Sequence, residues 1–179
     1  MITLKIYIYT NNIDLHCVSA FETIKTRNIC PFINSLERYR QCVLTFNVTT
    51  VHDAKIALSE LISSSYDLLN PNKESYYIET IPTIKSSYSH VIEVSHQDSN
   101  DDHQLCQRLK MNYSTNPLQN LTQSIVWHFL CNQPLAQTNI DELHSHVILS
   151  STRLKGLLVN PLFESVRICE LDNTPSLSS

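Results

Sequence analysis

Histidine and cysteine are the residues of this sequence that could carry chemistry most directly, with eight and six copies in the chain. The cysteines are scattered, and no two have the Cys-x-x-Cys spacing of a zinc ribbon or a thioredoxin-like site. His144 and His146 are two residues apart, whereas two metal ligands on one helix are normally four apart. We therefore expect no metal site, no cofactor and free thiols that are mostly buried.

Glycine is almost missing from the chain, which bears on several classes of enzyme. One glycine occurs in 179 residues, where average usage would give about a dozen. Phosphate loops, dinucleotide-binding loops and the Gly-x-Ser-x-Gly turn of many hydrolases need glycines at fixed positions, and none of these motifs occurs in the sequence. We expect a protein that is not an enzyme.

A binding function is indicated in the last third of the chain, where the apolar spacing fits two short helices that cross at a steep angle. Their inner faces would be formed by Ile140, Leu143 and Val147, and by Leu154, Leu157 and Leu158. Leu149 would fill the turn and Ser150 would cap the second helix. The outer face of that helix would then present four side chains to the DNA major groove, namely Ser151, Thr152, Arg153 and Lys155.

These residues resemble the first helix-turn-helix of the AraC-type transcription regulators. The resemblance covers about residues 118–163 and depends on Glu142-Leu143, Leu149-Ser150, Thr152-Arg153-Leu154-Lys155 and Leu157-Leu158. It also takes the segment 125–129 as a preceding helix that ends at Gln133-Pro134-Leu135. The resemblance implies a DNA-binding transcription regulator without catalysis, whose N-terminal part senses a ligand or forms a homodimer. Family members carry two such units, and the second unit is missing here.

A single helix from about Asn139 to Lys155 is the alternative interpretation of this segment. It keeps the apolar residues on one stripe and explains Gly156 as a C-cap. The two-helix interpretation instead places that glycine inside a helix, at a cost of about 1 kcal/mol. Against the single helix, Ser150, Ser151 and Thr152 would lie in its middle, where their side chains compete for backbone hydrogen bonds. Both interpretations stay open from the sequence.

The elements that must position this unit predict an α+β fold. Alternation from Ile2 to Tyr9 predicts a strand, and strands are also expected at 42–48, 76–81 and 90–94. Helices are expected at 51–66, after the cap formed by Thr50 and Asp53, and at 118–131, after Asn116-Pro117. We expect a mixed α/β part over residues 1–95, a polar linker over 96–103 and a helical part with the predicted helix-turn-helix over 104–179.

The charge of the chain leaves a second function open. A net charge of −4 argues against a wholly basic surface, although Arg153, Lys155 and Arg167 supply local positive charge. The alternative is an acidic adaptor or chaperone-like module that binds a partner protein through an aromatic surface near Tyr7, Tyr9, Tyr76 and Tyr77. The sequence shows no signal peptide and no long apolar run, so we expect a cytoplasmic protein without membrane contact.

Overall fold

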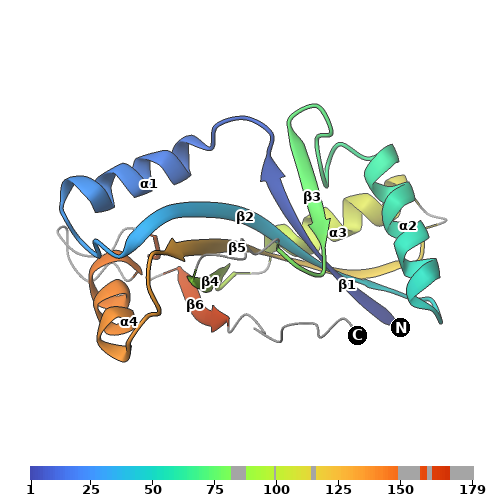
Figure 1. The fold of residues 1–179 in the computed structure, drawn as a ribbon. Coiled ribbons are helices and arrows are strands. Elements are labelled where there is room, and N and C mark those ends of the chain that lie inside the picture. Colours follow the sequence, from blue (N-terminus) through green and yellow to red (C-terminus); the bar gives the residue numbers. More distant parts are fainter. Residues whose placement is uncertain (82–87, 99, 114–115, 149–157, 161–162, 170–179) are drawn as a thin grey trace, which may run out of the picture.

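A six-stranded antiparallel sheet, with strand order β3-β1-β2-β5-β4-β6, forms the centre of the protein in a computed structural model (Figure 1). The structure describes residues 1–81, 88–98, 100–113, 116–148, 158–160 and 163–169. The strands are β1 (Ile2–Thr10), β2 (Ile33–Phe46), β3 (Glu74–Ile78), β4 (Tyr88–His96), β5 (Leu118–Cys131) and β6 (Glu164–Cys169). The helices are α1 (Leu15–Thr26), α2 (Val51–Ser64), α3 (Asn100–Asn112) and α4 (Gln137–Leu143), which continues into a π-helical turn, His144–Ile148.

The predicted helical C-terminal part is wrong, because half of its described elements are strands of this sheet. The predicted helix at 118–131 is β5, which pairs with β2 on one side and with β4 on the other. Asn116 does not cap a helix, since its Oδ1 accepts the Leu118 N–H at 3.2 Å in the turn that leads into the strand. After α4, the last described element is another strand, β6. The chain is therefore a mixed α/β fold throughout.

The expectations for the first ninety residues agree better with the structure. Strands form at all four predicted places, although β2 begins nine residues before its predicted start at Cys42. Helix α2 begins as predicted, with the Thr50 Oγ1 accepting the Asp53 N–H at 3.1 Å. In the predicted linker over 96–103, His96 ends β4 and the residues from Asn100 begin α3. The domain boundaries themselves stay a prediction.

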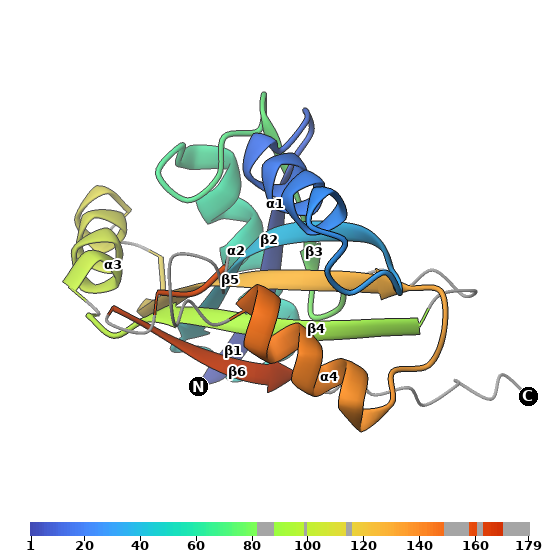
Figure 2. The same ribbon diagram turned by 90° about the vertical axis from the view of Figure 1, so that its left-hand side faces the viewer.

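The four described helices pack against one face of the sheet. Helices α2 and α3 cover Ile6 of β1 and Leu44 of β2, while α1 and α4 cover Ile92 of β4 and Phe129 of β5. The strand registers place these side chains on the same face. Figure 2 shows the four helices around the strands from a second direction. None of the described helices is long and apolar enough to cross a membrane.

The fold consists of two halves with the same topology, β1-α1-β2-α2-β3 and β4-α3-β5-α4-β6. In each half the first strand lies between the third and the second, and the second strands β2 and β5 pair at the centre of the sheet. Adding 86 to each residue number of β1 and 85 to each residue number of β2 turns every β1–β2 residue pair into a β4–β5 pair. Moving β3 by 90 residues does the same for the outer strands. The halves are therefore related by a pseudo-two-fold axis.

A sequence repeat accompanies this symmetry. Residues 68–78 (LLNPNKESYYI) and 158–168 (LVNPLFESVRI) are identical at six of eleven positions. The Asn70 N–H donates to the Glu74 Oε2 at 2.9 Å, and the Asn160 N–H donates to the Glu164 Oε2 at 2.8 Å. The same turn therefore leads into the edge strand of each half, and Glu74 and Glu164 are equivalent residues.

Candidate functional site

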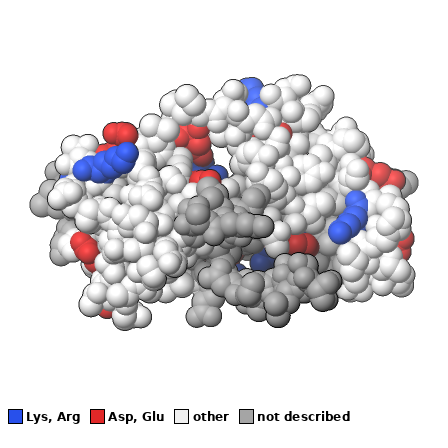
Figure 3. All heavy atoms as spheres, viewed as in Figure 1, with Lys and Arg blue, Asp and Glu red and all other residues white. Residues whose placement is uncertain are grey.

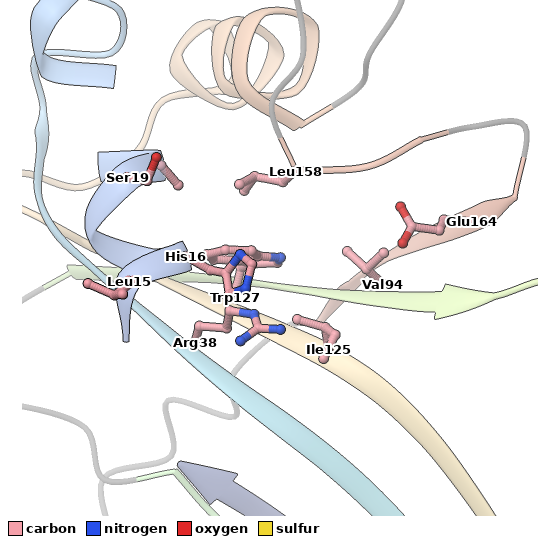
Figure 4. A pocket seen from close by; sticks show the side chains of 10 residues that line it. Leu15, His16, Ser19, Arg38, Val94, Ile125, Trp127, Leu158 and Glu164 are labelled. Carbon is pink, nitrogen blue, oxygen red and sulfur yellow. The ribbon is translucent and has the colours of Figure 1, made fainter. Parts of the chain in front are cut away.

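A cleft of about 420 Å³ opens on the helical face, between α1 and the start of β6. Its floor is apolar and comes from the two central strands of the second half, β4 and β5. Polar side chains surround this floor from α1, β2 and β6 (Figure 4). The lining residues are Leu15, His16, Ser19, Ala20, Arg38, Val94, Ile125, Trp127, Leu158 and Glu164.

Strand register explains why these side chains meet. Arg38 pairs with Trp127 across β2 and β5, and Val94 pairs with Ile125 across β4 and β5, so all four point to the helical face. Helix α1 begins beside them because the Asp14 Oδ1 accepts the backbone N–H groups of His16 and Cys17 at 3.0 and 3.2 Å. The start of α1 thus forms one wall of the cleft.

Arg38 provides the positive charge of the cleft. Its Nη1 donates to the Asp14 Oδ2 at 3.2 Å, and its guanidinium carbon lies 5.7 Å from the centre of the Trp127 ring. The ion pair and the ring hold the guanidinium in place. A guanidinium has five N–H donors, so the group can hold an anionic ligand atom while it keeps its bond to Asp14.

Glu164 provides a negative charge at the opposite side of the cleft, next to Val94 and away from Arg38 (Figure 4). Its Oε2 accepts the Asn160 N–H, and its Oε1 lies 3.9 Å from the Nε2 of the exposed His96. The side chain of Glu164 is 21% exposed. An apolar cleft with one carboxylate, one guanidinium and an aromatic ring has the composition of a small-molecule site.

The buried His90 of β4 and the half-buried His144 of the π-helical turn form a separate pair. Their ring centres lie 5.9 Å apart, and the Nε2 atom of each is buried and has no hydrogen-bond partner among the described residues. Burial, and secondly the neighbouring His144, lower the pKa of His90 to about 4. Burial also lowers the pKa of His144. The described residues hold no group of three or more side chains suited to a metal ion.

A Glu-His pair lies on the other face of the sheet. The His128 Nδ1 is 3.2 Å from the Glu37 Oε2, which also accepts a hydrogen bond of 2.7 Å from the Tyr39 hydroxyl. The hydrogen bond with His128 is the main cause that lowers the pKa of Glu37. Such pairs activate nucleophiles in enzymes, but the Nε2 of His128 is completely buried and no reactant can reach it.

The cysteines agree with the sequence expectation where the structure describes them. Cys17, Cys30, Cys42, Cys106 and Cys131 are free thiols and buried. Burial is the main cause that raises the pKa of four of them, to about 12 for Cys30 and to about 11 for Cys17, Cys42 and Cys131. Thiols with raised pKa values are protonated and unreactive at neutral pH.

The four residues predicted to contact DNA, Ser151, Thr152, Arg153 and Lys155, lie outside the described residues. The first helix of the predicted unit corresponds to α4 and its π-helical turn, where Leu143 and Val147 are buried as expected and Ile140 is half-buried. The face of the molecule in Figure 3 carries Lys and Arg side chains singly, without a continuous basic patch in its described part.

Part of the predicted aromatic surface exists. Tyr9 and Tyr77 stack with ring centres 4.8 Å apart, and Tyr7 and Tyr9 contact Tyr39 edge-on. Tyr76 lies on the opposite face, against the α2 core. The binding of a partner protein through these rings stays a prediction.

The sequence prediction identified none of the residues that line the cleft as site residues, and it assigned Ile125 and Leu158 to helices. A strand over this segment would have placed Ile125 and Trp127 on one face, but the four-residue spacing of Leu121, Ile125 and Phe129 also fits a helix. The repeat of LxNPxxESxxI was the signal that could have identified Glu164. No protein-family model matches this sequence, and no curated protein matches it either.

Proposed function

We propose that this protein acts by binding a small molecule in the cleft between α1 and β6, without catalysis. The observation that carries the proposal is the combination of an apolar floor with two opposite charges, Arg38 and Glu164, on a cavity of about 420 Å³. Most of the floor is rigid because Trp127 and Val94 are buried residues of paired strands. A site of this kind orients a ligand through a few polar contacts and gains affinity from apolar burial.

A thermal-shift screen tests this proposal. The library contains amino acids, amines, carboxylates and nucleotides, and a ligand of the cleft raises the melting temperature in a saturable way, since it binds only the folded state. Ser19→Phe should cancel the shift by filling the cleft from α1. Ile56→Phe is the matched control, on an exposed position of α2. The proposal fails if no compound stabilises the protein, or if Ser19→Phe responds like the wild type.

The second candidate is the DNA-binding transcription regulator that the sequence resemblance implies. One observation favours it: α4 buries Leu143, and its π-helical turn buries Val147 and Ile148. The segment 125–129, which the resemblance takes as a preceding helix, is part of strand β5. In such a protein the cleft would sense the ligand and the segment with Arg153 and Lys155 would contact phosphates.

DNA binding is tested by fluorescence anisotropy with pooled genomic fragments at two salt concentrations. Arg153→Ala and Lys155→Ala should each weaken binding and reduce the salt dependence by about one phosphate contact. An affinity that both variants leave unchanged, or no salt-dependent affinity at all, contradicts the regulator function.

A further inference from the structure

The pseudo-symmetric counterpart of the cleft, in the first half of the protein, is filled by an arginine. The Arg40 Nη2 donates to the Leu68 carbonyl at 2.9 Å and pairs with the Glu74 Oε1 at 3.3 Å. Its Nη1 donates to the Gln123 Oε1 at 3.2 Å. One guanidinium thus joins a central strand, the edge strand and the turn before it.

The second half keeps the acceptor side of this arrangement and lacks the arginine. The strand registers make Glu164 equivalent to Glu74 and place Ile125 where the first half has Arg40. The repeat likewise makes Leu158 equivalent to Leu68. Isoleucine is too short to reach the edge strand, so the space that Arg40 fills in one half is open in the other as the cleft.

The position of Gln123, the third partner of Arg40, also differs between the halves, and here the cleft has the charged residue. Gln123 of β5 is tied to the start of α3, because its Nε2 donates to the Asp102 Oδ1 at 3.2 Å. Its equivalent in β2 is Arg38, tied to the start of α1 through Asp14. Compared with the first half, the cleft therefore has no arginine beside Glu164 and has one, Arg38, beside helix α1.

The surroundings of Glu164 also favour a cation. A second cavity, of about 770 Å³, lies on the other side of this side chain. Asp98 and Asp101 line that cavity, and no Lys or Arg is among its described lining residues. A positive group beside Glu164 would lie in a region of negative potential.

We propose, on the basis of the ligand-binding function above, that the cleft binds a small zwitterion whose guanidinium or ammonium group pairs with Glu164. This group takes the place that Arg40 has in the other half. The carboxylate of the ligand faces Arg38, and its apolar stem covers Ile125. A basic α-amino acid has this combination of groups, and L-arginine is the probe that matches the missing side chain.

Isothermal titration of the whole chain with L-arginine and L-citrulline tests the cationic end. The two compounds have nearly the same shape, and citrulline carries a neutral ureido group in place of the guanidinium. We expect saturable binding of arginine and binding of citrulline weaker by about tenfold or more, because a charge-assisted hydrogen bond is lost. Citrulline binding as tightly as arginine would overturn the proposal.

Glu164→Gln tests the residue that receives the cation. Glutamine keeps the side-chain oxygen that accepts the Asn160 N–H, so the turn is retained. We expect arginine affinity to fall by about 10- to 100-fold, with no change in Glu60→Gln, an exposed carboxylate on α2. Unchanged affinity in Glu164→Gln contradicts the assignment. Agmatine lacks the carboxylate and therefore tests the proposed contact between that group and Arg38. If agmatine binds as tightly as arginine, the proposal that the ligand is a zwitterion is overturned.

Ile125→Arg restores in the second half the side chain that fills the first. We expect this variant to bind no arginine while it stays folded, and Ile56→Arg on the exposed face of α2 to bind normally. Arginine binding to folded Ile125→Arg with wild-type affinity would contradict the proposal, and if the variant does not fold, citrulline and Glu164→Gln decide. Where the thermal-shift screen finds ligands of the cleft and none is cationic, this inference fails and the proposed function stands.

Discussion

The buried His90 is one of the residues whose protonation links the stability of this protein to pH. The pKa of His90 is lowered to about 4 in the folded chain, against about 6.5 when it is unfolded. Between these values the unfolded state binds the proton and the folded state does not. The contribution of His90 to stability is therefore complete above about pH 6.5 and is lost as the pH falls towards 4.

We predict that the free energy of unfolding decreases by about 3 kcal/mol from this residue over that pH range. His90→Leu should have a shallower loss in urea titrations at pH 7 and pH 4.5, because it removes the buried titrating group. His52→Leu, at an exposed position on α2, is the control. Equal losses in His90→Leu and in the wild type would show that His90 does not cause the acid sensitivity.

At the scale of elements, β5 is the part of the fold on which the cleft depends most. Its residues from Ser124 to Cys131 are largely buried on both faces. Helices cover one face, and on the other face Val126 packs in a cluster with Tyr39 and Val91. Asn120, on the same face as Val126, is exposed near the other end of the strand. Burial thus increases along β5 towards the centre of the second half.

We predict that Val126→Ala lowers the free energy of unfolding by about 1–3 kcal/mol through lost burial and a residual cavity. Asn120→Ala should stay within about 0.5 kcal/mol of the wild type. Urea unfolding of both variants provides the measurement. If Val126→Ala were as stable as Asn120→Ala, the burial of Val126 against Tyr39 and Val91 would be contradicted.

This segment also shows what the sequence could predict and what it could not. Leu121, Ile125 and Phe129 are four residues apart, a spacing that keeps side chains together on a helix and on a strand alike. The first strand was predictable because Ile2 to Tyr9 alternate, one face being buried and the other less so. A strand buried on both faces loses that alternation, so length and partners, which the sequence alone does not show, determine its structure.

The candidate site was harder to predict than the elements. The lining residues come from α1, β2, β4, β5, β6 and the segment before β6, so they meet only through the order of the strands. The DNA-contact residues, by contrast, were proposed from one short segment because local spacing was sufficient to define them. The two LxNPxxESxxI segments, with Asn70 and Asn160 as equivalent residues, could have indicated the two halves from the sequence alone.

At the scale of the whole molecule, the two halves have kept the same backbone and changed the use of equivalent residues. Glu74 holds Arg40 and stabilises the fold, whereas Glu164 lies beside an open cleft. Equivalent carboxylates should therefore differ in their effect on stability. In the first half this carboxylate belongs to an internal ion pair, and in the second half it lines the cleft that we propose as a ligand site.

We predict that Glu74→Gln lowers the free energy of unfolding by about 1–2 kcal/mol more than Glu164→Gln, because it leaves the partly buried Arg40 without its charged partner. Both glutamines keep an oxygen for the turn N–H, so the comparison isolates the ion pair. Chemical unfolding of the two variants at the same pH measures the difference. Equal losses in both would contradict the division between the halves.

Trp127 provides the most direct measurement of the central claim, that the cleft of the second half is a ligand site. It is the only tryptophan of the chain and lines the cleft. Its emission should change in a saturable way during titration with each compound that raises the melting temperature, with the same dissociation constant as calorimetry gives. Saturable heat without any change in Trp127 emission would place the ligand elsewhere and contradict the claim.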